Sequence, residues 1–309
     1  MNISVVIPLF NKAEYIERAV HSVLSQKHPA SEIIVVDDGS TDAGASVVEK
    51  INSSKVRLLQ QANKGVSAAR NVGVHAANAE FVAFLDADDV WHDDFLSNIQ
   101  SLYQTFPDAR IFCTGYEFNT VEGKRAAKNQ HLLENRGLLQ DYFLACCNAD
   151  LPITSSSVCI AKDSLLKVGG FKEGLSLGED QAVWGSVACQ WPIAYDKSVS
   201  VMYDLTASSV GQSPSDFEQP SPHIFEFQRL LDDDIVPAEL IGSVRYLQHL
   251  TVMSSVKSNL LIGNRMKALK LLLTHPLLQW DRYRVAAFFL LIMPKSWIAR
   301  SYMALKHRR

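Results

Sequence analysis

Long apolar runs and paired cysteines are both missing from this chain of 309 residues. Its five cysteines include no CxxC spacing, which argues against a zinc site and favours reduced, buried thiols. The longest C-terminal apolar run, Val285 to Met293, stops at Pro294 and is much shorter than the ~20 residues that span a bilayer. No basic segment followed by an apolar one stands at the N-terminus, so we predict no signal peptide and a cytoplasmic protein.

A strong charge of one sign and a glycine-rich phosphate loop are also missing. The net charge is only −3, so the composition gives no reason to expect a nucleic acid partner. Neither G-x-G-x-x-G nor a Walker P-loop follows the first apolar run, so a nucleotide diphosphate would have to be held by a metal ion and basic side chains. The hydrophobic content of 47% is nevertheless ample for a core, in one large or two smaller domains.

Apolar runs of strand length alternate with stretches of helical periodicity in the N-terminal part of the chain. The runs that we predict to be buried strands are residues 3–9, 33–36, 56–59 and 81–85. This alternation predicts right-handed βαβ units and a mainly parallel sheet, which is an α/β fold. The later predicted elements are helices over 96–103, 138–146, 163–168 and 179–189 and strands over 110–117 and 156–161. The remaining segments are predicted as a loop or hairpin over 119–136, a linker or lid over 212–222, and helices from 223 onward.

Polar residues beside these elements are candidate helix caps, because a short polar side chain can accept a hydrogen bond from the first turn of a helix. Asn11 is predicted to cap the first helix. Gly39 allows a tight turn after the second strand, and Ser40 or Thr41 is predicted to cap the helix that follows it.

Acidic side chains follow two of the predicted strands. Asp37 and Asp38 follow the second strand, and Asp86, Asp88 and Asp89 follow the fourth. In open α/β sheets, ligands bind at the carboxyl ends of the strands. Asp86 and Asp88 are two residues apart, so both can turn toward one Mg²⁺ or Mn²⁺ ion that also holds a diphosphate. A turn that only caps the next helix, with Asp89 as N-cap, explains the same residues.

Basic residues and a third acid pair complete the set of candidate functional residues. Lys64 and Arg70 lie between the two acid clusters in the sequence, and the planar guanidinium suits phosphate, although a surface ion pair would also explain Arg70. Asp38 can accept a hydrogen bond from a base or a ribose. Glu179 and Asp180 begin a predicted helix, where carboxylates are favoured by the helix dipole. The functional alternative is a general base that removes a proton from an acceptor hydroxyl.

Five motifs in this order make the chain resemble a family 2 glycosyltransferase with the GT-A fold. The motifs are Val5-Val-Ile-Pro-Leu-Phe-Asn11, Ile34-Val-Val-Asp-Asp-Gly-Ser-Thr-Asp42, Asn63-Lys-Gly-Val-Ser-Ala-Ala-Arg-Asn71, Phe84-Leu-Asp-Ala-Asp-Asp89, and Gly169-Gly-Phe171 with Gly178-Glu-Asp180. The resemblance covers about residues 2–205. It implies a GT-A catalytic domain over 1–210, with a nucleotide-sugar half of about 1–118 and an acceptor half of about 119–210, followed by a helical extension over 211–309.

The resemblance also implies roles for single residues. Those implied to bind the nucleotide sugar are Pro8, Phe10, Asn11, Asp38, Lys64, Arg70 and Asp86. Asp38 would bond the base and Arg70 the base or a phosphate, while Asp88 would bind the Mn²⁺ or Mg²⁺ ion that bridges the diphosphate. Asp180 is the implied catalytic base, with Glu179 beside it, and members of the family invert the anomeric carbon.

The chain departs from the family pattern in two places. Trp184 is followed by Gly185 and Ser186, where many relatives carry Trp-x-Arg. The segment from Asp204 to Thr206 stands where many relatives carry an Arg-x-His that reaches metal or phosphate. His223 or a basic residue of the 119–136 loop could supply the missing contact, and nothing in the sequence chooses between them.

The C-terminal region is basic and aromatic, with no acid after Asp281. It suits peripheral contact with the cytoplasmic face of a membrane, although packing of its apolar residues on the catalytic domain would explain them as well. The function predicted from all these features is transfer of a sugar, with a UDP-sugar favoured, to a glycan or lipid-linked glycan in surface polysaccharide synthesis. A nucleotidyltransferase and a binding scaffold that has lost catalysis are the alternatives.

Overall fold

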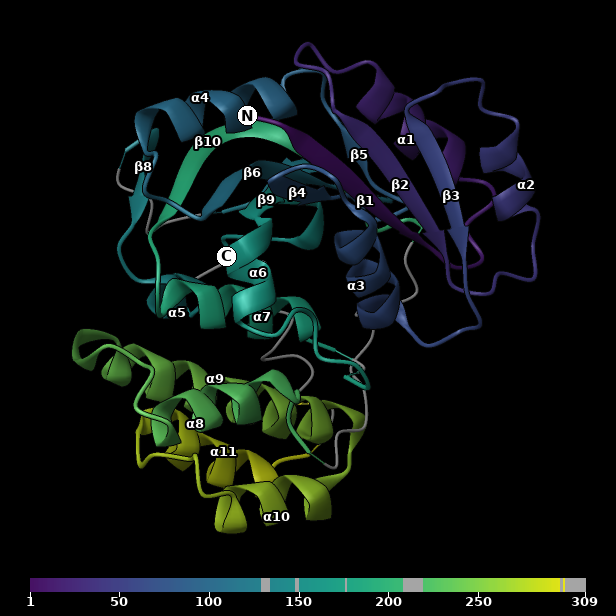
Figure 1. The fold of residues 1–309 in the computed structure, drawn as a ribbon. Coiled ribbons are helices and arrows are strands. Elements are labelled where there is room, and N and C mark those ends of the chain that lie inside the picture. The colour runs from purple at the N-terminus through teal and green to yellow at the C-terminus, as the bar shows by residue number, and fades with distance from the viewer. Residues whose placement is uncertain (129–133, 148–149, 176, 208–218, 295–296, 298–309) are drawn as a thin grey trace. The chain divides into compact units, whose positions relative to one another are not determined.

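The computed structural model describes residues 1–128, 134–147, 150–175, 177–207, 219–294 and 297. The chain divides into two compact units, residues 1–209 and residues 210–309 (Figure 1).

The first unit is built on one mixed sheet. Its strands are β1 Ile3–Leu9, β2 Glu32–Asp37, β3 Val56–Gln60, β4 Phe81–Phe84, β5 Val90–Trp91, β6 Ile111–Thr120, β7 Gly123–Ala126, β8 Arg136–Leu139, β9 Val158–Ala161 and β10 Ile193–Asp204. The order in the sheet is β3-β2-β1-β4-β9-β6-β10-β5, with β7 paired to β6 and β8 to β10. Strands β1 to β4 pair in parallel, while β9 pairs antiparallel with both β4 and β6. The predicted α/β class, with a mixed sheet flanked by helices, is confirmed.

Helices cover both faces of this sheet (Figure 1). They are α1 Ile16–Leu24, α2 Gly44–Glu49, α3 Val66–Ala76, α4 Phe95–Thr105, α5 Tyr142–Cys146, α6 Lys162–Lys167 and α7 Glu179–Ala188. Side chains of α1 and α4 share a core with one face of β1, while α3 packs on the other face through Gly73. A Cβ atom at Gly73 would overlap the side chain of Val6, so the close contact between α3 and β1 requires glycine there. Because β1 and β2 are covered on both faces, every residue of each is buried.

The predicted cap at Asn11 is wrong. Helix α1 begins at Ile16, and its N-cap residue Tyr15 makes no side-chain cap bond. Asn11 has a φ of 51°, and its Oδ1 accepts a hydrogen bond from the backbone N–H of Thr41 at 2.8 Å. A left-handed residue at this position turns the side chain toward the neighbouring loop instead of toward the helix.

The other predicted caps are wrong as well. Helix α2 begins at Gly44, whose N–H donates to Oδ1 of Asp42 at 2.9 Å, so neither Ser40 nor Thr41 caps it. Asp89 lies in the turn before β5, and the next helix, α4, begins only at Phe95.

Two element boundaries also differ from the predictions. The helix predicted over 138–146 is limited to α5, because Leu138 belongs to β8 and pairs with β10. The strand predicted over 110–117 continues to Thr120, where it turns into β7 as one form of the predicted hairpin. Residues 129–133 of that loop and most of the predicted linker over 212–222 lie outside the described residues.

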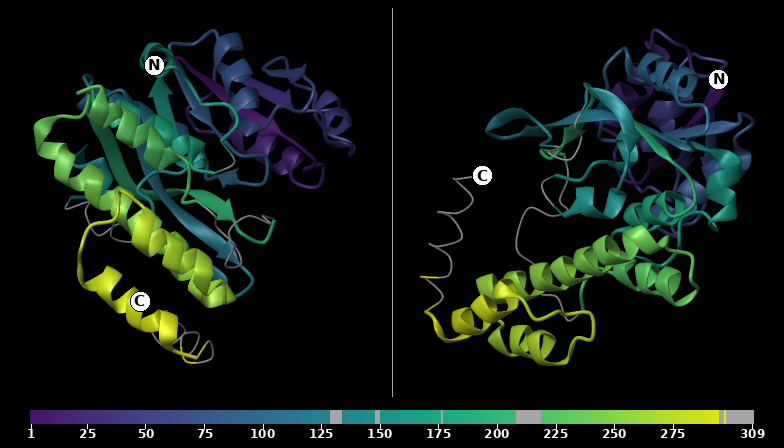
Figure 2. Two further views of the ribbon diagram at one scale, coloured as in Figure 1. Left: turned by 90° about the horizontal axis from the view of Figure 1, so that it is seen from below. Right: turned by 90° about the vertical axis from the view of Figure 1, so that its left-hand side faces the viewer.

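The second unit is helical in its described part, as predicted. Its helices are α8 His223–Asp232, α9 Ile241–Ile262, α10 Arg265–Thr274 and α11 Arg282–Ile292, with a short 3₁₀ turn at Ala238–Leu240. Helix α9 contacts each of the other three, and apolar residues from all four helices form the core of this unit (Figure 2). Among the described helices of the chain, none is both long and apolar enough to cross a membrane.

Candidate active site

The carboxyl ends of three neighbouring strands bring two of the acid clusters to one edge of the sheet. Strand β1 lies between β2 and β4, and parallel pairing sets Leu9 beside Asp37 and Val6 beside Phe84. The acids that follow β2 and β4 therefore emerge at the same edge. This is the edge at which α/β sheets bind ligands.

Asp38 holds the loop that leads into α3. Its carboxylate accepts hydrogen bonds from Gln61 Nε2 at 2.7 Å, from the backbone N–H of Lys64 at 2.9 Å, and from that of Gly65 at 2.8 Å. The side chain is buried. An ionised carboxylate offers about four acceptor positions, so these three bonds leave room for one more donor.

Arg70 is the centre of a buried ion-pair network. Its guanidinium donates to Asp86 Oδ1 and to Glu179 Oε1, each at 2.8 Å, and lies 5.4 Å from the ring centre of Phe171. Burial alone would lower the pKa of Arg70, but the two carboxylates raise it above its ordinary value. One side chain of α3 thus joins the end of β4 to the start of α7. We call Arg70, Asp86, Glu179 and Asp180 the Arg70 cluster.

Asp180 lies in the first turn of α7. Gly178, in a left-handed conformation with φ of 78°, directs the chain into this helix. The backbone N–H of Gln181 donates to Asp180 Oδ1 at 2.7 Å, and Ser155 Oγ lies 3.4 Å from Oδ2. Burial raises the pKa of Asp180 to about 6, with a further rise from Glu179 and an opposing effect of Arg70. A carboxylate with such a pKa is ionised at neutral pH and still accepts a proton readily.

A serine turn that the sequence analysis missed links the acids to one another. Ser156 Oγ donates to the carboxylate of the buried Asp89 and accepts from the backbone N–H of Asp86 at 3.0 Å. The indole N–H of Trp91 donates to the backbone oxygen of Ser156 at 2.7 Å. The available signal was the polar run from 154 to 157 immediately before a fully apolar strand.

A second ion-pair network surrounds Asp88. Lys12 Nζ donates to Asp88 Oδ2 at 2.7 Å and to the backbone oxygen of Ala207 at 2.8 Å. Arg18, on α1, donates to the backbone oxygen of Asp88 and to the carboxylate of Asp204. We call Lys12, Arg18, Asp88 and Asp204 the Lys12 cluster. Sequence reasoning singled out neither of its two cations.

Asp204 ends β10 at the place where the family pattern has Arg-x-His. Burial opposes ionisation of its carboxyl, but hydrogen bonds from Thr206 and Arg18 lower its pKa below the ordinary value. Strand β10 therefore contributes a negative charge to the Lys12 cluster. The positive charge comes from Lys12, after β1, and from α1.

The donor set around Asp88 fits Mg²⁺ or Mn²⁺. The candidate ligands are carboxylate oxygens, and these ions are commonly held by one or two carboxylates together with water and substrate phosphates. Among the residues that the structure describes, no group of three His, Cys, Asp or Glu side chains is arranged to hold a metal. In a site of this kind, substrate phosphates and water would supply the remaining ligands of the metal.

Three other residues named in the sequence analysis are Pro8, Phe10 and His223. Pro8 is buried within β1, whereas Phe10, directly after the strand, is exposed for a large apolar residue. His223 is the first residue of α8, and burial lowers its pKa to about 4. Its imidazole is therefore neutral at pH 7 and does not supply the missing positive charge.

Basic residues of the 119–136 loop are already engaged within the described part of that loop. Lys124 Nζ lies 2.9 Å from the carboxylate of Glu117, and Arg125 pairs with Asp150 at 2.7 Å. These ion pairs do not involve either of the two clusters of the site.

A family model described as Glycosyl transferase family 2 matches residues 4–168, which is more than half of the chain. The chain belongs to glycosyltransferase family 2. The matched region of the glycosyltransferase includes Asp38, Arg70, Asp86 and Asp88, and it ends before helix α7 with Glu179 and Asp180.

Curated relatives agree with this assignment. The glycosyltransferase is 37% identical over 136 residues to the putative teichuronic acid biosynthesis glycosyltransferase TuaG of Bacillus subtilis, a match covering 43% of this chain and 54% of TuaG. It is 46% identical over 108 residues to an uncharacterized glycosyltransferase of Nostoc sp., with 34% of each chain covered. The matches thus span about a third to a half of the length of these relatives.

Solved structures share the fold. The glycosyltransferase superposes on S. aureus TarS, residues 1–349 in complex with UDP-GlcNAc, with a TM-score of 0.67 and 20% identity, covering 88% of this chain and 80% of that one. The mannosyltransferase PcManGT of Pyrobaculum calidifontis, in complex with GDP-Man and Mn²⁺, gives a TM-score of 0.59 at 16% identity, covering 98% and 80%. Likeness at such identities shows the GT-A architecture, which is consistent with the predicted fold.

Proposed function

We propose that this glycosyltransferase moves a sugar, with inversion, from a nucleotide diphosphate sugar to a hydroxyl of a glycan or lipid-linked glycan in surface polysaccharide synthesis. The observation that carries the proposal is the bridge made by Arg70, which joins the acid at the donor edge, Asp86, to the helix that presents Asp180. A donor site and a base tied to one rigid element suit a reaction that depends on alignment. The UDP-GlcNAc complex of TarS favours a UDP-sugar, and the name of TuaG favours polysaccharide synthesis.

The nucleotide would lie over the carboxyl ends of β1 and β2. Asp38 has acceptor capacity left for one N–H of a base, while Pro8, Phe10, Asn11 and Lys64 line the same edge around it. The exposed ring of Phe10 offers a surface for stacking a base.

The diphosphate would lie between Asp86 and Asp88. A divalent metal bound at Asp88 would offset the negative charge that grows on the departing diphosphate. Lys12 and Arg18 add positive charge from the protein itself, in place of the Arg-x-His of relatives. Lys12 reaches Asp88 with a flexible side chain, so it can also reach a phosphate oxygen beside that carboxylate.

Asp180 would act as the base. An acceptor hydroxyl gives its proton to the Asp180 carboxylate while its oxygen forms the new bond to the anomeric carbon. The bond from that carbon to the diphosphate oxygen breaks, and the electron pair leaves with the nucleotide. Attack on the face opposite to the leaving group inverts the anomeric carbon. The pKa of about 6 means that most of the base is ionised at neutral pH.

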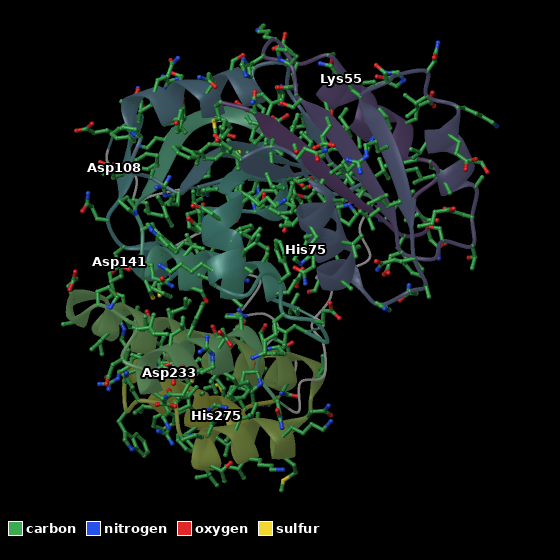
Figure 3. All side chains as sticks on the ribbon, in the orientation of Figure 1. Lys55, His75, Asp108, Asp141, Asp233 and His275 are labelled. Atoms are coloured by element: carbon green, nitrogen blue, oxygen red, sulfur yellow. The ribbon has the colours of Figure 1, made fainter. Side chains whose placement is uncertain are left out.

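The test compares Asp88→Asn and Asp180→Asn with Asp108→Asn, a change at an exposed acid after α4 (Figure 3). A panel of UDP-, GDP- and dTDP-sugars with Mn²⁺ is scored by thermal unfolding and by transfer to acceptor glycans. We expect one donor to stabilise the wild-type chain by about 2.7 kcal/mol at 100 times its Kd. Asp88→Asn should lose this shift, Asp180→Asn should keep it and lose transfer, and Asp108→Asn should retain both.

Two results would redirect the assignment. Donor binding without transfer to any acceptor would favour the scaffold that has lost catalysis. No shift with any nucleotide sugar in the presence of metal would contradict the transferase proposal itself.

A further inference from the structure

Charge is divided very unevenly along the chain. Residues 241–309 contain twelve Lys or Arg and a single acid, Asp281, whereas residues 1–240 contain eighteen Lys or Arg and 32 acids. The near-neutral total therefore conceals a strongly basic C-terminal segment. Such a segment attracts anionic surfaces at the ionic strength of a cell.

One side of helix α11, its inner side, packs against the core of the second unit. Ala287 belongs to the core of the second unit, and Phe288 and Leu291 pack against that core. Arg284 is buried, and its guanidinium donates to the backbone oxygens of Leu272 and Leu278. The helix is therefore anchored within its own unit. Arg284 is part of the structure of that unit and is not one of its exposed charges.

Helix α11 also has an outer side, which is apolar and exposed. Val285, Phe289 and Ile292 are 45%, 61% and 80% exposed, and their spacing of four and three residues places them along one line of the helix. Trp280, just before the helix, is not part of this line, because its ring stacks on Phe288 and on the guanidinium of Arg284. Large apolar side chains exposed side by side mark a surface that another apolar phase covers.

We propose that helix α11 lies flat on a bilayer that contains anionic phospholipid. Phe289 and Ile292 would enter the boundary between headgroups and acyl chains. Arg282, on the same side of the helix as Phe289, would meet the phosphates. Because residues 241–309 carry twelve Lys or Arg and one acid, the bilayer that this helix meets should be anionic.

The charges on neighbouring elements agree with this occupant. The only acid of the segment, Asp281, is engaged within the protein, since it accepts a hydrogen bond from the backbone N–H of Arg284 at 2.8 Å and lies 3.1 Å from His249 Nε2. Helix α10, which packs against α11, carries the exposed Lys270. The other described acids of this unit lie on or just after α8 and in the 3₁₀ turn, at Glu226, Asp232, Asp233, Asp234 and Glu239. A helix of 11 residues is too short to span a membrane but long enough to lie in its surface.

The experiment measures sedimentation of the full chain with vesicles of phosphatidylcholine alone and of phosphatidylcholine mixed equally with phosphatidylglycerol. The double variant Phe289→Ser, Ile292→Ser removes the apolar side, and Val121→Ser, Leu166→Ser removes two exposed apolar residues of the first unit as a matched control. Arg282→Glu is compared in the same way with Lys50→Glu, at an exposed position of the first unit. Thermal unfolding of each variant checks that it is folded.

We expect the wild-type chain to sediment with the anionic vesicles and to be released by added salt. The double variant should bind about tenfold more weakly, because two large apolar side chains no longer enter the interface. Arg282→Glu should also bind more weakly, and both control variants should bind like the wild type.

Equal binding of the double variant and the wild type, or no binding to anionic vesicles, would overturn the proposal. A dimer in solution that the double variant converts to a monomer would also overturn it, because a second copy would then cover the helix. Vesicle binding requires no sugar transfer, so this result stands apart from the test of the proposed function.

Discussion

The Arg70 cluster and the Lys12 cluster each pair a cation with an acid of the Asp86-Ala-Asp88 turn, yet the two cations differ in burial. The side chain of Arg70 is 3% exposed and bonds two carboxylates, while that of Lys12 is 26% exposed and bonds one carboxylate and a backbone oxygen. Breaking a buried ion pair leaves an uncompensated charge, whereas a partly exposed pair can separate into water at a smaller cost. The comparison indicates that Asp86 is held in place by its buried ion pair with Arg70. Asp88, in contrast, can exchange Lys12 for another cation.

The largest effect is expected from Arg70→Gln. Removing the guanidinium leaves Asp86 and Glu179 facing each other without a cation, so the free energy of unfolding should fall by about 3 kcal/mol. Urea unfolding at pH 7 measures this change. The matched control is Arg57→Gln, which removes a half-exposed pair with Glu32 and should cost about 1 kcal/mol or less. If both variants lost the same free energy of unfolding, the buried and the partly exposed ion pairs would not differ in their contribution to stability.

The next effect concerns the pH dependence of Asp180. Its pKa in the folded chain is about 6, above its ordinary value, so the folded state holds the proton more tightly than the unfolded state does. The carboxyl group therefore destabilises the fold increasingly as pH rises from about 4 through about 6. Asp180→Asn should raise the free energy of unfolding by about 1–2 kcal/mol at pH 7 and by almost nothing at pH 4.

Activity offers a second measurement of the same group. If Asp180 is the base, kcat/KM of the wild-type enzyme should rise with pH through about 6. Arg70 favours the ionised carboxylate, so any residual activity of Arg70→Gln should show this rise at a higher pH. A flat profile in the wild type would argue against Asp180 as the base.

The smallest effect on stability is expected from Lys12→Met. The partly exposed ion pair should contribute about 1 kcal/mol or less to the free energy of unfolding. The same change frees Asp88 from an ammonium group, so Mn²⁺ alone should bind more tightly, as measured by calorimetry. The nucleotide sugar should bind less tightly, because a cation near its phosphates is lost. Weaker Mn²⁺ binding in this variant would show that Lys12 does not compete for Asp88.

Much of the framework was predictable from the sequence, for a physical reason. Residues 81–85 are all apolar and residues 3–9 are apolar except for Ser4, because both faces of the sheet are covered, and such runs are easily recognised in a sequence. The placement of the acids at the strand ends followed directly from those runs. The family pattern then supplied roles that no local pattern contains.

The contacts inside the site were not predictable in this way. Arg70 and Glu179 are 109 residues apart, and nothing local to either residue indicates the other. The contacts of Ser156, Lys12 and Arg18 likewise join residues that are far apart in the sequence. The cap predicted at Asn11 failed because its side chain bonds the neighbouring loop, a choice decided by the packing of two βα turns against each other.

Gly73 lies one turn after Arg70 on α3, and its backbone packs directly against the side chain of Val6 on β1. A single methyl group there would lift the helix from the sheet and carry the guanidinium away from Asp86 and Glu179 together. The alignment of donor edge and base therefore depends on a position that contacts neither, and we expect Gly73→Ala to damage transfer more than its modest size suggests. The distance between α3 and β1 therefore decides whether the donor edge and the base are aligned for transfer.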